Sequence, residues 1–267
     1  MEGHPSELID LNRYPIKDLT CPQAQELIAY CRDHLKSMGC CVLPGFVTTA
    51  ATSKMAAEAQ AIVPQTYWST VEGNAYLEPE DKSLPEDNPR NMTEITKLGA
   101  LAYDQIPTQH ALRRLFEWDG LMEFLAACLE KKELFRYADP MGALNVAVMK
   151  DGDYLRWHFD QTDFVTSIAL QDAEEGGDFE CVPNIRRADA ENYDKVRAVL
   201  QGDRTGVVKV EMDPGALVLF QGRYTIHRVT PIKGKALRLV ALLGYDTKPG
   251  VVSSEHLRYM RYGRTVQ

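Results

Sequence analysis

The stretch YLRWHFDQTDFVTSIALQ, residues 154–171, predicts two short strands separated by a polar turn. Side chains alternate between the two faces of a strand, so His158 and Asp160 point to one face and Phe159 points to the other. An imidazole and a carboxylate on one face can hydrogen-bond to each other, face the solvent or bind a metal ion. The surrounding sequence has to distinguish between these three possibilities.

The sequence after Pro140 has the residue pattern of an all-β structure. Short apolar segments separated by Gly, Pro and Asp recur as NVAVMK, YLRWHFD, FVTSIALQ, DFECV, GVVKVEM, ALVLF, TIHRVT and RLVALLGYD. About eight short strands with turn residues between them predict a sandwich or barrel, and eight is the number of strands in a jelly roll. The polar residues 184–205 form a long connection with room for a short helix.

The first 140 residues have a mainly helical pattern. Residues 21–39 carry apolar side chains at helical spacing and end at Gly39, a common helix stop. Residues 40–47 predict a short buried strand, and the acidic, proline-rich residues 78–91 predict a loop. We therefore expect one domain, mainly β with a helical N-terminal half. Its expected parts are a helical part over 1–140, a jelly-roll core over 141–246 and a C-terminal tail over 247–267.

The composition is that of an ordinary globular protein. The net charge of −8 argues against nucleic acid or an anionic membrane as the partner. The N-terminus lacks a signal-peptide pattern, and no apolar run is long enough to span a membrane. Six cysteines form no CxxC pair, which favours free thiols in a reducing compartment and hence a cytoplasmic protein. The sequence carries no signal of an oligomeric state.

Two residues further along the chain favour the metal-binding interpretation. His227 lies in the predicted strand YTIHRVTP, and two histidines with one carboxylate on a shared face form the facial triad of non-haem Fe(II). Arg238 lies in ALRLVALLGY, where an arginine is costly unless it meets an anion. Arg238 either pairs with an internal Asp or Glu, points outward from a sheet edge, or holds a small dicarboxylate with its guanidinium.

These residues and the motifs around them resemble the 2-oxoglutarate/Fe(II) oxygenases. The similarity is to the branch that contains free-amino-acid halogenases and related amino-acid hydroxylases. It runs from about residue 100 to the C-terminus through AYDQIP, FEWDGLMEFL, YADPMGALNVAV, WHFDQTDFVTSIALQDAEEGGDFECVPNIR, GALVLFQGRYTIHRVTP and YDTKPGV. The resemblance implies a dioxygenase with a double-stranded β-helix, Fe(II) on His158, Asp160 and His227, and O₂ as cosubstrate. It also implies 2-oxoglutarate chelating the iron, with its distal carboxylate on Arg238.

The chain departs from the family pattern at one position. Many members carry Ser or Thr two residues after this arginine, where this chain has Val240. A second partner for the distal carboxylate must therefore come from elsewhere. Asn145, in the strand expected to open the barrel, is a candidate contact for 2-oxoglutarate, or alternatively caps a strand end. In halogenating members a small residue replaces the carboxylate, so Asp160 favours hydroxylation.

Substrate recognition has weaker signals. Arg90 and Arg156 are candidate partners for a substrate carboxylate, and Gln161 and Thr162 are expected at the edge of the pocket. Each is alternatively an exposed polar group or part of a structural pair. The resulting hypothesis is hydroxylation of an aliphatic carbon of a free amino acid or similar small molecule. Desaturation or ring closure with the same cofactors, a cupin-type metalloenzyme and a non-catalytic jelly-roll binding protein are the alternatives.

Overall fold

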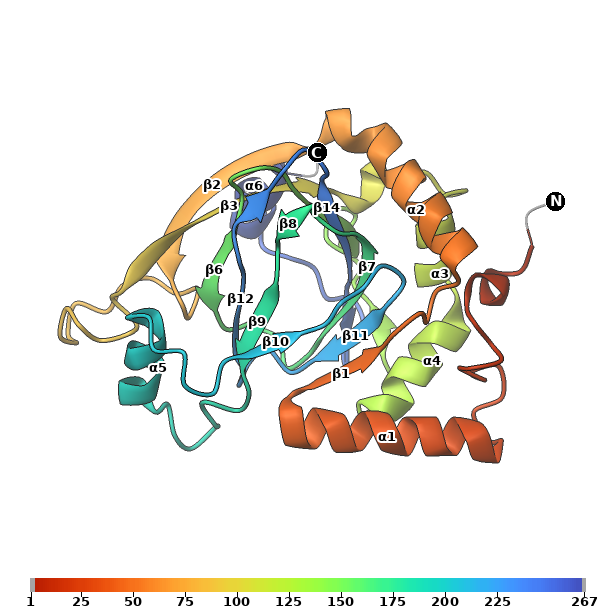
Figure 1. Cartoon of the computed structure of the whole chain (residues 1–267), viewed down its shortest axis with the longest axis horizontal. Coiled ribbons are helices and arrows are strands. Elements are labelled where there is room, and N and C mark those ends of the chain that lie inside the picture. Colours follow the sequence, from red (N-terminus) through yellow and green to blue (C-terminus); the bar gives the residue numbers. More distant parts are fainter. Residues whose placement is uncertain (1–2, 266–267) are drawn as a thin grey trace.

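Two antiparallel sheets face each other at the centre of the computed structural model, which describes residues 3–265 (Figure 1). Within this range the larger sheet has seven strands in the order β1-β11-β7-β14-β5-β3-β2. These strands are β1 (Cys40–Leu43), β2 (Tyr67–Asn74), β3 (Thr93–Leu101), β5 (Leu144–Met149), β7 (Val165–Gln171), β11 (Leu217–Phe220) and β14 (Arg238–Leu243). The order is far from the sequence order, as expected for a jelly roll.

The smaller sheet carries the stretch from which the sequence analysis began. Within the described residues its order is β10-β9-β12-β6, with β6 (Leu155–His158), β9 (Phe179–Val182), β10 (Val208–Val210) and β12 (Ile226–Val229). Two further pairs of short strands complete the fold, namely β8 (Glu175–Gly176) with β13 (Ile232–Lys233) and β4 (Phe135–Arg136) with β15 (Tyr245–Asp246). The double-stranded β-helix with packed helices is confirmed.

Four helices cover the outer face of the larger sheet (Figure 1). They are α1 (Pro22–Met38), α2 (Thr49–Ile62), α3 (Ala111–Phe116) and α4 (Asp119–Cys128), and α5 (Tyr193–Leu200) lies in the polar connection after β9. Leu239, Ala241 and Leu243 of β14 pack against this helical layer, so the alternating residues face the interior between the two sheets. No helix within residues 3–265 has the length and apolar character needed to cross a membrane.

The structure differs from the sequence prediction in two places. The 1–140 part supplies β2 and β3 to the larger sheet, although only the strand at residues 40–47 was expected there. The predicted C-terminal tail contains helix α6 (Glu255–Tyr262), which packs against β2 and β3. The helix is capped at its start by the Ser254 hydroxyl and ends at Gly263, whose φ is 68°.

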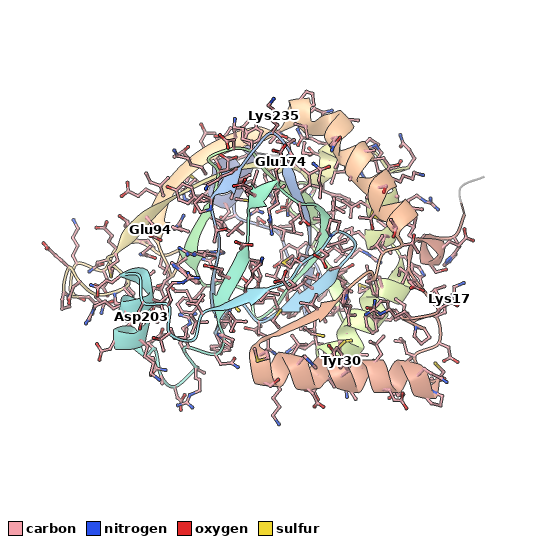
Figure 2. All side chains as sticks on the ribbon, in the orientation of Figure 1. Lys17, Tyr30, Glu94, Glu174, Asp203 and Lys235 are labelled. Carbon is pink, nitrogen blue, oxygen red and sulfur yellow. The ribbon has the colours of Figure 1, made fainter. Side chains whose placement is uncertain are left out.

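Short 3₁₀ turns are the remaining regular elements of the described chain. They are η1 (Pro5–Leu8), η2 (Val63–Gln65) and η3 (Tyr103–Gln105). One end of the barrel is closed by the turns that flank β8 and β13. Figure 2 shows Glu174 and Lys235 together at this end. The Glu174 carboxylate accepts hydrogen bonds from the backbone N–H groups of Lys235 and Ala236, each at 3.1 Å, which fixes the chain just before β14 begins.

Candidate metal site

The two histidines lie opposite each other on neighbouring strands of the smaller sheet. His158 ends β6 and is the register partner of His227 in β12, and their ring centroids are 4.0 Å apart. Asp160 follows two residues after β6, and its backbone N–H donates to the Gly222 carbonyl at 3.0 Å. Its Oδ1 lies 3.8 Å from His158 Nε2 and 3.6 Å from His227 Nε2. One donor atom from each of the three residues lies within 4.8 Å of the others, an arrangement that could hold a metal ion.

The second nitrogen of each imidazole fixes which nitrogen is free to bind a metal. His158 Nδ1 lies 3.0 Å from the Arg156 carbonyl oxygen, and His227 Nδ1 lies 3.0 Å from the Thr225 carbonyl oxygen. A carbonyl only accepts, so Nδ1 carries the proton in both rings and Nε2 keeps its lone pair. Metal-binding histidines are commonly oriented by such a backbone contact. Both Nε2 atoms are therefore available as ligands.

Burial keeps both rings neutral at physiological pH. It lowers the pKa of His158 to about 3, with the neighbouring His227 adding to the effect and Asp160 opposing it. Burial likewise lowers the pKa of His227 to about 4. Burial raises the pKa of the Asp160 carboxyl, and the charges of His158 and Arg261 act in the opposite direction. A divalent cation would bind the two neutral imidazoles and compensate for the buried carboxylate, so these donors fit Fe(II).

Gly222 lies against the third of these residues. A Cβ atom built on Gly222 would lie 1.6 Å from Asp160 Oδ2 and 2.9 Å from Asp160 Cβ. These contacts involve both the end and the base of the Asp160 side chain. The Asp160 carboxylate would therefore have to move if residue 222 carried a side chain. Sequence reasoning missed this residue because nothing in QGRYTIH indicates that the Gly222 backbone returns to residue 160.

We expect Gly222→Ala to weaken iron binding while leaving the fold intact. The added methyl displaces the Asp160 carboxylate from the position it shares with the two imidazoles. Loss of a group that orients a ligand typically costs roughly 10–100-fold in metal affinity. Gly222 does not have a positive φ, so the alanine itself adds no backbone strain. Anaerobic Fe(II) titration would measure the change, and wild-type affinity in a folded variant would contradict the expected displacement.

Arg238 lies on the interior face at the end of the barrel closed by β8 and β13. Only 7% of the residue is exposed, and Nη1 lies 4.0 Å from the Met149 sulfur. No carboxylate of residues 3–265 forms an ion pair with it within 4.0 Å. Burial lowers the pKa of Arg238 to about 10, and Asp172 and Asp178 oppose this from a longer distance. The internal partner that the sequence left open is therefore not in direct contact, and the guanidinium can accept an anionic ligand.

Small and apolar side chains lie between Arg238 and the triad. Val240 is paired with Ala147 on one side and Ala169 on the other, all on the interior face. Phe179 and Phe220 pack against the His227 ring with centroid distances of 5.6 and 4.7 Å. The interior thus offers one cation-binding cluster and one anion-binding side chain, and mainly apolar side chains line the interior around them.

Asn145 lies on the interior face of β5, near the end of the barrel away from Arg238. Its side-chain oxygen accepts a hydrogen bond of 2.9 Å from Arg261 Nη2 on α6. Asn145 is buried, and its register partner is Leu242 of β14. The sequence did not indicate that a C-terminal arginine would reach this position, although Ser254 and Gly263 on either side of the segment are readable helix-end signals.

The two arginines suggested for substrate binding have different environments. Arg90 forms ion pairs with Glu78 and, at 3.7 Å, with Glu191, and its guanidinium stacks over Tyr76 at 4.4 Å. These contacts tie the 78–91 loop to the connection before α5. Arg156 is buried in the wall of the barrel, where Nη1 donates to Thr96 Oγ1 at 2.8 Å and Nε has no partner among the described residues.

Gln161 and Thr162 lie directly after the triad carboxylate. Gln161 Nε2 donates to the Leu77 carbonyl at 3.1 Å, which connects the polar turn to the start of the 78–91 loop region. Thr162 Oγ1 donates to the Phe164 carbonyl at 3.1 Å. Both residues are thus placed beside the metal-site strand, and neither makes a direct contact with a triad side chain in the described structure.

Solved structures with this fold include several oxygenases. The carbocyclase SnoK from nogalamycin biosynthesis is similar with a TM-score of 0.57 and 16% identity, over 91% of this chain and 93% of SnoK. A Trichoplax adhaerens prolyl hydroxylase, solved with a hypoxia-inducible-factor peptide, is similar with a TM-score of 0.55 and 15% identity. The similarity covers 86% of this chain and 94% of the hydroxylase. The epimerase SnoN, solved with Fe³⁺, alpha ketoglutarate and nogalamycin RO, is similar with a TM-score of 0.56 and 15% identity. The similarity covers 83% of this chain and 84% of SnoN. At these identities the similarity concerns the fold.

The sequence itself provides the assignment to a family. No curated protein matches the chain. The family described as Halogenase D matches residues 23–254, a span that contains the triad, Arg238 and Asn145. The matched span covers most of the chain and extends well before residue 100, where the motifs quoted above begin. With the jelly roll and the triad in place, the chain is an enzyme that belongs to the Halogenase D family.

Proposed function

We propose that the chain is an Fe(II)- and 2-oxoglutarate-dependent oxygenase that hydroxylates an aliphatic carbon of a free amino acid or a similar small molecule. The observation that carries the proposal is the convergence of two neutral histidines and Asp160 in the same barrel interior as the buried Arg238. Membership of the Halogenase D family and the fold shared with SnoN, which was solved with iron and alpha ketoglutarate, support it.

The chain's own residues have separate tasks in this reaction. His158, Asp160 and His227 would hold Fe(II), and Arg238 would pair with the distal carboxylate of 2-oxoglutarate. When bound, the iron supplies the site at which O₂ and 2-oxoglutarate react. Phe179 and Phe220 shield the His227 side of the cluster from water. The overall reaction converts a substrate C–H bond, O₂ and 2-oxoglutarate into a C–OH group, succinate and CO₂.

Asn145 remains a proposed contact for 2-oxoglutarate, and its side-chain N–H₂ group is the part available for it. The amide oxygen already accepts from Arg261, so the nitrogen is free to donate. Arg156, Gln161 and Thr162 remain proposed substrate contacts because they flank the triad in the chain. Arg90 remains a proposed contact of the loop, although Glu78 and Glu191 already neutralise its charge.

Hydroxylation is favoured over halogenation by the carboxylate at position 160. A halide needs an open position on the metal, which Asp160 would occupy as a ligand. Members of the halogenating branch, which this chain resembles, have a small residue at this position. The carboxylate of Asp160 therefore distinguishes this chain from them. Desaturation or ring closure with the same cofactors remains the second outcome, and SnoK, which shares the fold, is a carbocyclase.

We expect the wild-type enzyme to add oxygen and no chlorine when it turns over in chloride buffer. The experiment incubates it with Fe(II), 2-oxoglutarate, O₂ and each proteinogenic amino acid, and analyses products by mass. Asp160→Gly opens a position for chloride, but a halide there also needs polar partners arranged around it. We expect this variant to decompose 2-oxoglutarate with little product of either kind. Chlorination by the wild type, or full hydroxylation by Asp160→Gly, would contradict the role proposed for Asp160.

A further inference from the structure

Helix α6 carries Arg258 and Arg261, Arg264 follows its C-terminal Gly263, and the three arginines have different partners. Arg258 Nε lies 3.1 Å from Asp139, a fully buried acid that also accepts the Ser253 N–H at 2.7 Å. Arg264 forms a two-point ion pair with Asp104, with both contacts at 2.7 Å. Spacing of three places Arg258 and Arg261 on neighbouring parts of one helix face. The Arg258–Asp139 pair holds the helix in place, and the Arg264–Asp104 pair holds the residues that follow it.

Arg261 has no such acidic partner. Within residues 3–265 no carboxylate lies within 4.0 Å of its guanidinium, and its Nε is buried without a hydrogen-bond partner. One nitrogen, Nη2, donates to the Asn145 side chain at 2.9 Å. A buried N–H without a partner carries a desolvation cost, which a bound anion would remove. A guanidinium presents further donors in the fork geometry that matches a carboxylate.

The position of Arg261 connects it with the metal site. Asn145, its hydrogen-bond partner, faces the barrel interior that also contains the triad. Ala100, Ala102, Met141 and Tyr262 form the small apolar cluster by which α6 packs beside this end of the barrel. Arg261 thus reaches the barrel interior from the end opposite Arg238.

We infer that Arg261 binds a carboxylate of the organic substrate and so selects substrates that carry one. The inference rests on the proposed function and specifies its substrate class. The other two candidate arginines are less free to do this. Arg90 already pairs with two carboxylates. Arg156 is held in the barrel wall, where a Cβ atom on Gly73 would lie 2.7 Å from its Nη2. Arg238 and Arg261 then divide the two acids between opposite ends of the site, 2-oxoglutarate on the first and substrate on the second.

The test compares carboxylates with their carboxamides in Arg261 variants. Protein loaded anaerobically with Fe(II) and 2-oxoglutarate is titrated by calorimetry with each proteinogenic amino acid and with the carboxamide of each one that binds. We expect wild type to prefer the acid by roughly 10–100-fold, the range for a charge-assisted pair. Arg261→Gln should lose this preference by weakening the acid alone, and Arg261→Lys should recover part of it. Arg187→Gln, an exposed arginine that pairs with Asp189 at 3.5 Å outside α6, is the control and should keep the preference.

Several results would overturn the inference. Arg261→Gln could bind the acid as wild type does, or lose acid and amide affinity equally, which would indicate a structural role for α6. Wild type could also bind no amino acid at all while still binding Fe(II) and 2-oxoglutarate. The visible absorption of the Fe(II)·2-oxoglutarate complex, recorded before each titration, separates these results from a failure of the proposed function. Loss of that absorption in wild type would reject the cofactors, whereas its presence with unchanged acid binding would reject only Arg261.

Discussion

Replacing His227 with alanine is expected to reduce turnover to the background rate and to remove most of the bound iron. The imidazole supplies one of three protein ligands, and its Nε2 is the free nitrogen because Nδ1 is paired with the Thr225 carbonyl. Loss of a direct ligand should exceed the roughly 10–100-fold cost of losing a group that merely orients one. Iron content and product formation would be measured together, with circular dichroism to follow the fold.

His34→Ala provides the matched control for this experiment. His34 is half-buried on α1, and its Nδ1 is paired with the Tyr30 carbonyl, so it shares the backbone contact but not the metal cluster. It should leave iron content and turnover unchanged. A folded His227→Ala enzyme with wild-type iron content would remove His227 from the ligand set, and the same logic applies to His158 and Asp160.

Arg238→Leu is expected to raise the concentration of 2-oxoglutarate needed for half-maximal activity by roughly 10–100-fold, the range for a charge-assisted pair. The organic substrate should be affected far less, because the guanidinium lies at the end of the barrel away from Asn145 and Arg261. Steady-state kinetics with each ligand varied in turn would separate the two effects. An equal loss of affinity for both ligands would indicate that Arg238 has only a structural role.

Arg228→Leu is a suitable control for the arginine variant. Arg228 lies in β12 next to His227, but it pairs with Glu180 at 2.8 Å and stacks over the Trp157 ring at 4.8 Å. It is therefore a strand arginine with an internal partner, the alternative that the sequence left open for Arg238. Its replacement should lower stability without changing the requirement for 2-oxoglutarate.

The strands with apolar, alternating patterns could be predicted from the sequence, and the exposed ones could not. β5, β7 and β14 are buried on both faces and appear as apolar runs. β2 is the edge strand of the larger sheet, and most of its residues are exposed or half-buried. Its segment YWSTVEGN therefore lacks the apolar periodicity by which a strand is recognised. The segment is a strand because its backbone pairs with β3 along its whole length.

The candidate site divides in a similar way. Residues that lie close in the chain, such as His158 and Asp160, could be paired from strand alternation, and His227 followed from its own strand. Contacts between distant segments could not be read from spacing. Gly222 meets Asp160 across 62 residues, and Arg261 reaches Asn145 across 116. Both contacts arise from the way the chain returns to the barrel, which depends on tertiary packing.

The most direct measurement is the visible absorption of the wild-type protein mixed with Fe(II) and 2-oxoglutarate without oxygen. We expect a weak charge-transfer band that requires both additions, because 2-oxoglutarate would chelate the iron held by His158, Asp160 and His227. The band should be lost in His227→Ala and should need more 2-oxoglutarate in Arg238→Leu. A cupin-type metalloenzyme or a non-catalytic binding protein would give no such band. Its absence in iron-loaded wild-type protein would contradict the proposal that this chain is a 2-oxoglutarate-dependent oxygenase.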